Sequence, residues 1–355
     1  MALSNAIVPV LPYLADDLSF QTLIFSSYFF GAMLATLPAG VASDRYGQAF
    51  LIMISLSIVF ISGILISTVP NPVLLLFWRL IEGIGTGIFL SSALSWINYQ
   101  KDSFKNTGYF MASMNFGLLA GLIGTGWLTM ISGALFSGVW FFTICCFFIA
   151  IYSFFYPFPE MGERFSVSAR VLVTETGHLI FRQYPLWISV VVLLGCTGYA
   201  QAVFPELSGS PAHEVSIILA AMNFATIITS LLAHRLKTDP VLVIRISAVM
   251  MIPVLFTFLK MPFTVLIMGA IAGITLVSQV GYLSIAEKHQ GIAMGLFSTC
   301  SYGGMTLIPA VGGFLITISS FELSSLFIAA FVVVTAVTIG NCSCRGFTSK
   351  DHNGI

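Results

Sequence analysis

Charged side chains are scarce in this chain of 355 residues. Only 8% of the residues are Asp, Glu, Lys or Arg, whereas a soluble domain carries about 25%. Hydrophobic residues make up 57% of the chain, and the mean hydropathy is +0.99. The formal net charge is zero, so nothing in the composition favours a nucleic-acid partner. These values exclude an ordinary soluble domain and indicate a protein that crosses the lipid bilayer several times.

Signatures of catalysis and of metal binding are also missing from the sequence. All five histidines fall in predicted loops, in the tail or at helix ends, and no His-Glu-x-x-His sequence occurs. There are no paired intramembrane aspartates, no convincing Ser/His set and no phosphate-binding loop. We therefore expect no enzyme, no catalytic residue, no metal and no cofactor, and ATP is not the evident energy source.

Cysteine is too infrequent for a disulfide framework. Cys342 and Cys344 lie at the end of the last predicted helix beside Arg345, without a second pair, so a metal or redox role there is the less favoured alternative. The other four cysteines lie in apolar runs, where the thiol behaves as a small hydrophobic group: Cys145, Cys146, Cys196 and Cys300.

What the sequence does contain is a series of long apolar runs, each long enough for an α-helix to cross the hydrocarbon core. They are too long and continuous for the alternating strands of an outer-membrane barrel. Eleven full spans are predicted, at about residues 21–42, 49–69, 73–98, 108–130, 134–156, 185–205, 214–235, 241–259, 263–286, 291–318 and 322–341. Residues 1–14 are too short to span, so we interpret them as the second half of a first helix that is clipped or has a late start codon.

A polar segment divides the predicted helices into two sets of six. The predicted organisation is an N-terminal half at 1–157, a cytoplasmic linker at 158–184, a C-terminal half at 185–341 and a polar, disordered tail at 342–355. Within the linker, residues 167–181 have the pattern of a short amphipathic helix at the membrane surface.

Basic residues fix the predicted orientation. When the loop that contains Arg45 is placed inside, eleven of the fourteen Lys and Arg residues are inside. Only Lys260 is then outside, and Arg79 and Arg245 fall within helices. We therefore expect a multi-pass protein of the cell membrane with both termini in the cytoplasm.

The loop between the second and third helices has a recognisable pattern. Gly40, Asp44, Arg45 and Gly47 form Gly-x-x-x-Asp-Arg-x-Gly, which resembles the cytoplasmic loop signature of the major facilitator superfamily. The two basic residues that usually follow are absent, because Gln48 and Ala49 occupy those positions. An ordinary inner loop with one arginine is the alternative.

The resemblance also implies a role for this loop in a cytoplasmic gate. It places Asp44 near the start of the eleventh helix, at Gly291–Gly295, when the transporter faces outward. Arg45 is expected to pair across the gap with an acidic residue such as Asp102. Because the basic pair is missing, we expect a weaker lock than is usual.

Arg79 and Glu82 are the deepest ionisable pair in the predicted spans. Their i,i+3 spacing puts them on one face of the fourth helix, which is expected to face the bundle interior rather than lipid. With Gly83 and Gly85 they resemble the Arg-x-x-Gln-Gly-x-Gly motif of proton-coupled members, with Glu82 in place of Gln. We interpret Glu82 as a proton-coupling or cation-contacting group; a static ion pair is the alternative.

The fifth predicted helix is rich in glycine, with Gly117, Gly121, Gly124 and Gly126. This spacing resembles the fifth-helix motif of drug:proton antiporters, but Leu122 stands where that motif has proline. Close helix packing is the favoured interpretation of these glycines and of Gly83 and Gly85, which leaves the antiporter assignment open.

Other polar residues within the spans are candidates for a central cavity, because the resemblance places their helices around one. Each of them is also a candidate for an ordinary hydrogen bond between helices. They are Asn5, Tyr28, Asn115, Tyr199, Gln201, Asn223, Gln279, Tyr282 and Tyr302.

The fold class predicted from these features is an all-α membrane protein of major facilitator type, with twelve helices in two pseudo-symmetric halves of six. The resemblance implies a monomeric secondary transporter of a small molecule in the lipid bilayer, with proton-coupled efflux as the first choice. A uniporter or importer of a small solute, or a non-transporting membrane sensor or scaffold, are the alternatives.

Overall fold

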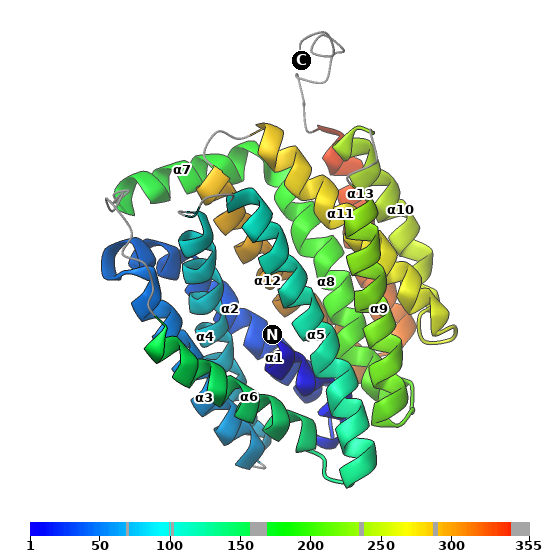
Figure 1. Ribbon diagram of the computed structural model, residues 1–355. Helices are drawn as coiled ribbons and strands as arrows, with labels where there is room; N and C mark the ends of the chain where they lie inside the picture. The colour runs from blue at the N-terminus through cyan, green and yellow to red at the C-terminus, as the bar shows by residue number, and fades with distance from the viewer. Residues whose placement is uncertain are drawn as a thin grey trace.

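The computed structural model describes residues 1–68, 71–98, 100, 103–156, 169–233, 238–286 and 290–341. This described part is helical and contains no β-strand (Figure 1). We define the N half as α1 (Ala2–Ala6), η1 (Val8–Tyr13), α2 (Leu18–Tyr46), α3 (Gln48–Thr68), α4 (Pro72–Asn98), α5 (Ser103–Ser132) and α6 (Ser137–Phe155). The linker helix is α7 (Ala169–Arg182). We define the C half as α8 (Tyr184–Leu207), α9 (Ala212–Ala233), α10 (Pro240–Thr257), α11 (Phe263–Ala286), α12 (Gln290–Ile318), α13 (Phe321–Thr338) and η2 (Ile339–Asn341).

Eleven helices of the described part, α2 to α6 and α8 to α13, are long and apolar enough to cross a membrane. They coincide with the eleven long runs of the sequence, so the predicted fold class is confirmed. The predicted first helix is present as α1 and η1, which form a short helical segment in the middle of the bundle (Figure 1). Pro9 and Pro12 lie in η1, where they are incompatible with a regular α-helical hydrogen-bond ladder.

The helices pack in pairs within each half. In the N half α2 packs on α4, α4 on α3, α3 on α6, and α1 on α5; in the C half α8 packs on α12, α11 on α9 and α10, and α13 on α10. The two halves meet where α2 packs on α12, where α5 packs on α9, and where η1 packs on α8. We call the α2–α12 contact the seam.

Glycines allow backbones to approach closely at the level of the ion pair. A Cβ on Gly83 would collide with the carbonyl oxygen of Tyr28, and a Cβ on Gly31 would collide with that of Leu80. A Cβ on Gly87 would lie 2.6 Å from the carbonyl oxygen of Ala32. Only residues without a side chain fit at these positions, so the glycines fix the register between α2 and α4.

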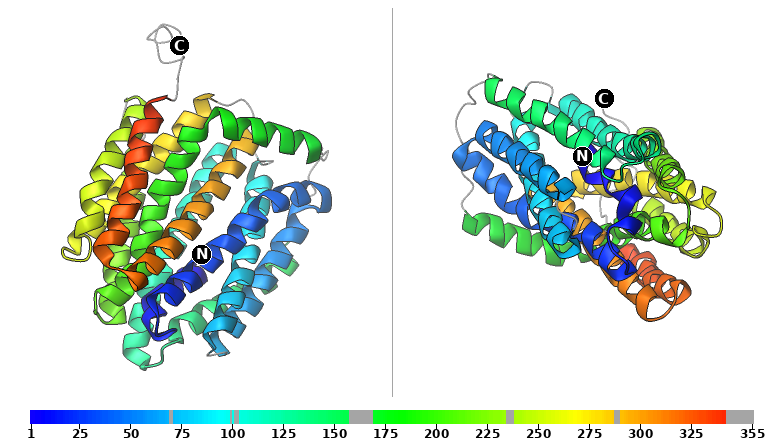
Figure 2. Two further views of the ribbon diagram at one scale, coloured as in Figure 1. Left: turned by 180° about the vertical axis from the view of Figure 1, so that it is seen from behind. Right: turned by 90° about the horizontal axis from the view of Figure 1, so that it is seen from below.

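We call inner the end of the bundle at which α2 meets α3, and outer the opposite end. The inner end is the one that the distribution of basic residues predicts to be cytoplasmic, and this orientation stays a prediction. The helix predicted at 167–181 is present as α7, which crosses at the inner end and lies at the rim of the bundle (Figure 2). Linker residues 157–168 and the predicted tail at 342–355, with Cys342 and Cys344, lie outside the described residues.

Candidate transport site

The deepest charged groups form an ion pair inside the N half. Arg79 Nη1 donates to Glu82 Oε2 at 2.6 Å, and each side chain is only 1% exposed. Both residues lie on α4, one helical turn apart, on the face that packs against α2. The pair therefore faces the bundle and not lipid, as the i,i+3 spacing predicts.

An aromatic ring covers the arginine. The guanidinium carbon of Arg79 lies 4.6 Å from the centroid of the Tyr28 ring, within the range of a cation–π contact. Glu82 Oε1 and Arg79 Nε are buried and have no hydrogen-bond partner among the described residues. A buried polar atom without a partner is costly, and the second carboxylate oxygen of Glu82 is such an atom. Whether it binds a proton or a solute group stays a prediction.

The predicted gate motif lies at the inner end of α2. Gly47 ends the helix with φ of +94°, a backbone conformation that favours glycine, and the chain turns there into α3. The guanidinium carbon of Arg45 lies 5.5 Å from the ring centroid of Tyr46. Gln48, which replaces a basic residue of the motif, donates to Ser95 Oγ at 3.3 Å and so ties this turn to α4.

Two partners predicted for the gate lie outside the described part of the structure. They are the side chain of Asp44 and the whole of Asp102. Gly40, the first glycine of the motif, has open space where a Cβ would be, with no atom within 4 Å. The gate pairing of Arg45 with Asp102 therefore stays a prediction.

The glycines expected to serve packing lie against backbone or side chains of other helices. Gly85 lies against α3, where a Cβ would be 2.9 Å from Val59 Cγ2. On α5, a Cβ on Gly117 would be 3.2 Å from Met1 Cβ, and Gly121 abuts the carbonyl oxygen of Ala2. Gly85 therefore lets α3 approach α4, which carries the ion pair. Gly117 and Gly121 let the start of the chain and α1 approach α5.

Several of the nine polar residues proposed to line a cavity have hydrogen bonds within their own half. Asn115 and Asn223 donate to carbonyl groups of their own helices, those of Met111 (2.9 Å) and Leu219 (3.0 Å). Two others connect neighbouring helices: Asn5 donates to the carbonyl oxygen of Leu118 at 3.2 Å, and Tyr199 donates to Ser324 Oγ at 3.1 Å.

A second polar group lies in the C half between α8 and α11. Gln279 Nε2 donates to Ser189 Oγ at 3.1 Å, and the Tyr282 hydroxyl donates to Gln183 Oε1 at 2.9 Å. Gln201 is buried on α8. The structure thus brings Tyr28, Arg79 and Glu82 together in one half and Gln279 and Tyr282 together in the other. Whether these groups contact a solute stays a prediction.

Sequence reasoning did not identify the contacts that hold the outer ends of the two halves together. Gln21 Nε2 donates both to the carbonyl oxygen of Ala15 (2.8 Å) and to Glu206 Oε2 (3.0 Å). Ser19 Oγ donates to Thr317 Oγ1 at 2.7 Å. We call the Gln21–Glu206 and Ser19–Thr317 contacts the outer latch, because each of them joins α2 of the N half to α8 or α12 of the C half.

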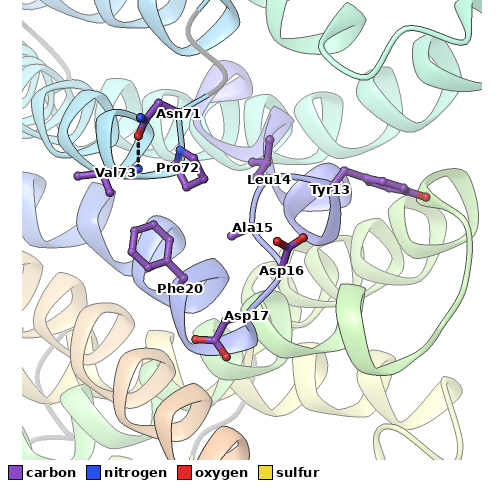
Figure 3. Close-up of a pocket in the computed structure, with 9 residues that line it drawn as sticks. All are labelled: Tyr13, Leu14, Ala15, Asp16, Asp17, Phe20, Asn71, Pro72 and Val73. Atoms are coloured by element: carbon purple, nitrogen blue, oxygen red, sulfur yellow. Dashed lines mark hydrogen bonds between the residues drawn. The ribbon is translucent and has the colours of Figure 1, made fainter.

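A depression of about 580 Å³ lies beside the latch on the outer surface (Figure 3). Asp16 and Asp17 from the η1–α2 loop and Phe20 from α2 line it, opposite Asn71 and Pro72 at the start of α4. Asp17 Oδ1 also accepts a hydrogen bond from Thr317 Oγ1 at 3.3 Å. The loop that forms this depression is therefore connected to the outer latch.

The site and the fold together define a polytopic helical membrane protein built of two halves, with a buried ion pair and with hydrogen bonds that join the halves at the outer end. The sequence profile described as Major Facilitator Superfamily matches residues 1–284. The chain belongs to this superfamily of membrane transporters.

Solved structures support the fold. The chain is similar to a structure of a mutant form of the nucleoside transporter NupG, with a TM-score of 0.74, 16% identity and 96% of each chain covered. It is also similar to a D-xylose-proton symporter, with a TM-score of 0.71, 16% identity, and 95% of this chain and 92% of that one covered. At these identities the likeness concerns the fold alone.

One curated relative matches over a short stretch. Monosaccharide-sensing protein 3 of Arabidopsis thaliana is 33% identical over 76 residues, which are 21% of this chain. The match spans only 10% of the length of that protein. Its name therefore adds little to what the superfamily and the fold establish.

Proposed function

We propose that this transporter moves a small molecule by alternating access and that the movement is coupled to protons through Glu82. The observation that carries the proposal is the Arg79–Glu82 pair, which is 1% exposed and leaves one carboxylate oxygen without a partner. Ionisable groups at this depth are expensive, and a purely structural helix gains little from them. A carboxylate that can be neutral or charged beside a fixed arginine is suited to carry a proton across the membrane.

Export is the first choice for the direction of transport, on the resemblance of the α4 pair and the α5 glycines to proton-coupled export motifs. Uptake is the second candidate, because one of the similar solved structures is that of a D-xylose-proton symporter. Both directions require the same proton site, so the role of Glu82 does not depend on the choice. We further propose a monomer in the cell membrane with its termini in the cytoplasm.

The Glu82→Gln variant tests the proton role. Glutamine is the residue that the family motif carries at this position, and its amide oxygen can still accept from Arg79, so the variant is expected to fold. In proteoliposomes, we expect wild-type protein to accumulate a solute against its gradient when a pH difference is imposed. The variant is expected to lose this accumulation and to keep exchange of labelled for unlabelled solute, because exchange needs no net proton transfer.

The solutes to be assayed are a panel of sugars, nucleosides, drugs and dyes. Full pH-driven accumulation by Glu82→Gln would contradict the proton role. Accumulation that is absent in both proteins, with exchange present in both, would indicate a uniporter. Binding without any flux would indicate a sensor built on the same fold.

The outer latch supports alternating access, and it gives a second test. Glu206→Ala removes the charged acceptor of Gln21, a hydrogen bond worth about 1.5–3 kcal/mol. We expect the outer end to open more often, so that a cysteine introduced at Thr22, which lies in the seam against Gly313, reacts about tenfold faster with a polar thiol reagent. The matched control is Glu214→Ala, an exposed carboxylate on α9 at the same end of the bundle. Equal reaction rates in both variants would show that the latch does not hold the outer end closed.

A further inference from the structure

The aromatic ring over Arg79 is the first member of a series of rings that leaves the ion pair and reaches the opposite half. Tyr28 and Phe29 are neighbours on α2, with ring centroids 4.9 Å apart and planes at 85°. Phe29 in turn lies 6.1 Å from the ring of Tyr302 on α12, across the seam. Aromatic pairs at these separations attract each other beyond simple burial.

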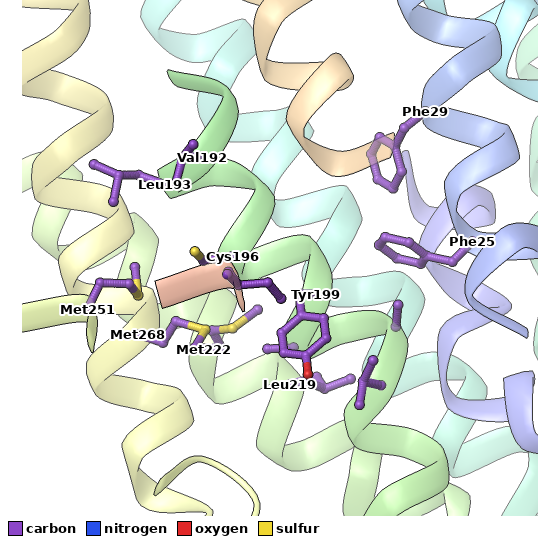
Figure 4. Packing of buried hydrophobic residues seen from close by; sticks show 14 of the residues in the cluster. Phe25, Phe29, Val192, Leu193, Cys196, Tyr199, Leu219, Met222, Met251 and Met268 are labelled. Atoms are coloured by element: carbon purple, nitrogen blue, oxygen red, sulfur yellow. The ribbon is translucent and has the colours of Figure 1, made fainter. Parts of the chain in front are cut away.

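The position of Phe29 in the seam is well defined. Phe25, one turn earlier on α2, lies 5.0 Å from Phe29, and both rings project from α2 toward the C half (Figure 4). Phe29 is 8% exposed and Tyr28 is 2% exposed. Next to Tyr302, Gly303 leaves room for Met33 of α2, so α12 approaches α2 closely at this level. Movement of the Phe29 ring therefore changes a contact between the two halves.

The backbone gives Tyr28 little freedom to compensate. Its carbonyl group abuts Gly83 of α4, the residue that follows Glu82. The side chain of Tyr28 is thus held between the guanidinium group on one side and Phe29 on the other. When Glu82 takes up a proton, Arg79 loses its counter-charge, and the Tyr28 ring of α2 is in direct contact with the guanidinium group.

We propose that Tyr28 and Phe29 are positioning residues that transmit the charge state of the Arg79–Glu82 pair to Tyr302 on the opposite half. This inference rests on the proposed function, because it needs Glu82 to change its protonation during transport. It adds a physical route from the proton site to the contact between the halves, through three rings.

Other titratable groups near Glu82 are few among the described residues. Arg79 lies on the same helix, Tyr28 comes from α2, Cys146 from α6, and the amino group of Met1 from the start of α1. Tyr302 of α12 lies close enough to Tyr28 to interact with it electrostatically. Arginine stays protonated throughout the accessible pH range, and Glu82→Gln separates the contribution of Glu82 from that of the Met1 amino group.

The test measures how pH shifts the distance between the halves. Spin labels are placed at two exposed outer positions, Ser132 on α5 and Ser319 after α12, in a cysteine-depleted protein in lipid nanodiscs. We expect the wild-type distance distribution to change with pH, and Glu82→Gln to abolish this change. Tyr28→Leu, Phe29→Leu and Tyr302→Leu are each expected to lose the pH response as Glu82→Gln does. Tyr28→Phe, which keeps a ring over Arg79, is expected to retain it.

The matched control is Phe60→Leu, which removes a ring pair with Phe147, with centroids 5.1 Å apart, between α3 and α6 and outside the seam. It is expected to keep the full pH response. If Glu82→Gln abolishes the response but Tyr28→Leu and Phe29→Leu retain it, the aromatic route is wrong and the proton role of Glu82 stands. If Glu82→Gln leaves the response unchanged, the proton role fails, and the aromatic route fails with it.

A double-mutant comparison tests whether the two changes act on one route. Phe29→Leu combined with Glu82→Gln is expected to have the same pH response as Glu82→Gln alone, because both changes interrupt one route. If each single variant lost only part of the pH response, and the two losses added together in the double variant, the proposal would be overturned.

Discussion

Glu82→Leu is expected to destabilise the folded protein by about 3–5 kcal/mol, because it leaves the guanidinium group of Arg79 buried without a counter-charge. Arg79→Leu is expected to cost less, since the carboxyl group of Glu82 can become neutral by taking up a proton, whereas arginine cannot lose its own. For the same reason the stability of Arg79→Leu is expected to rise as the pH falls. The measurement is thermal unfolding in detergent at several pH values.

The double variant Arg79→Leu/Glu82→Leu completes this comparison. With both charges replaced by leucine, no buried charge remains, and we expect a stability close to that of the wild-type protein. Arg245→Leu, an exposed arginine on α10, is the control and is expected to change stability by less than about 1 kcal/mol. A Glu82→Leu variant as stable as wild type would show that the ion pair is hydrated and not buried.

Gly83→Leu is expected to disrupt the folding of the N half. A Cβ at this position would collide with the Tyr28 carbonyl oxygen, and a backbone atom in a packed helix pair cannot move aside. We expect a loss of more than about 4 kcal/mol, seen as aggregation or as the absence of a monodisperse peak in size-exclusion chromatography.

A glycine on another helix provides the control for this substitution. Gly281 of α11 has open space at the Cβ position, with no atom within 4 Å, so Gly281→Leu is expected to yield folded protein in normal amounts. If Gly83→Leu also gives folded protein, α2 and α4 are farther apart than the structure has them, and the Tyr28 ring does not cover Arg79.

The apolar runs predicted the spans well because the hydrocarbon core demands a long apolar helix wherever the chain crosses it. Hydropathy says less about where a helix ends. The run at 21–42 becomes α2 (Leu18–Tyr46), and the run at 108–130 becomes α5 (Ser103–Ser132). Both helices continue beyond their apolar parts. The backbone hydrogen bonds of a helix also form in the polar surface layer of the membrane, and a helix can carry charged residues such as Arg45 there.

The ion pair was predictable because Arg79 and Glu82 lie on one helix, where spacing alone decides which side chains meet. Tyr28 was predicted only as a cavity residue. Its place over Arg79 depends on the register between α2 and α4, which the glycines at 31 and 83 fix through three-dimensional packing. The contact between Gln21 and Glu206 joins residues 185 positions apart, and no local pattern relates them.

The central claim is that Glu82 carries a proton during transport, and the movement of that proton can be measured directly. Proteoliposomes with a trapped pH probe are mixed with each solute of the panel, with no pH difference imposed beforehand. We expect one solute to change the internal pH with wild-type protein and to leave it unchanged with Glu82→Gln, although the variant still exchanges that solute. If the same solute moves protons equally through both proteins, Glu82 is not the proton site, and the buried pair serves only the structure.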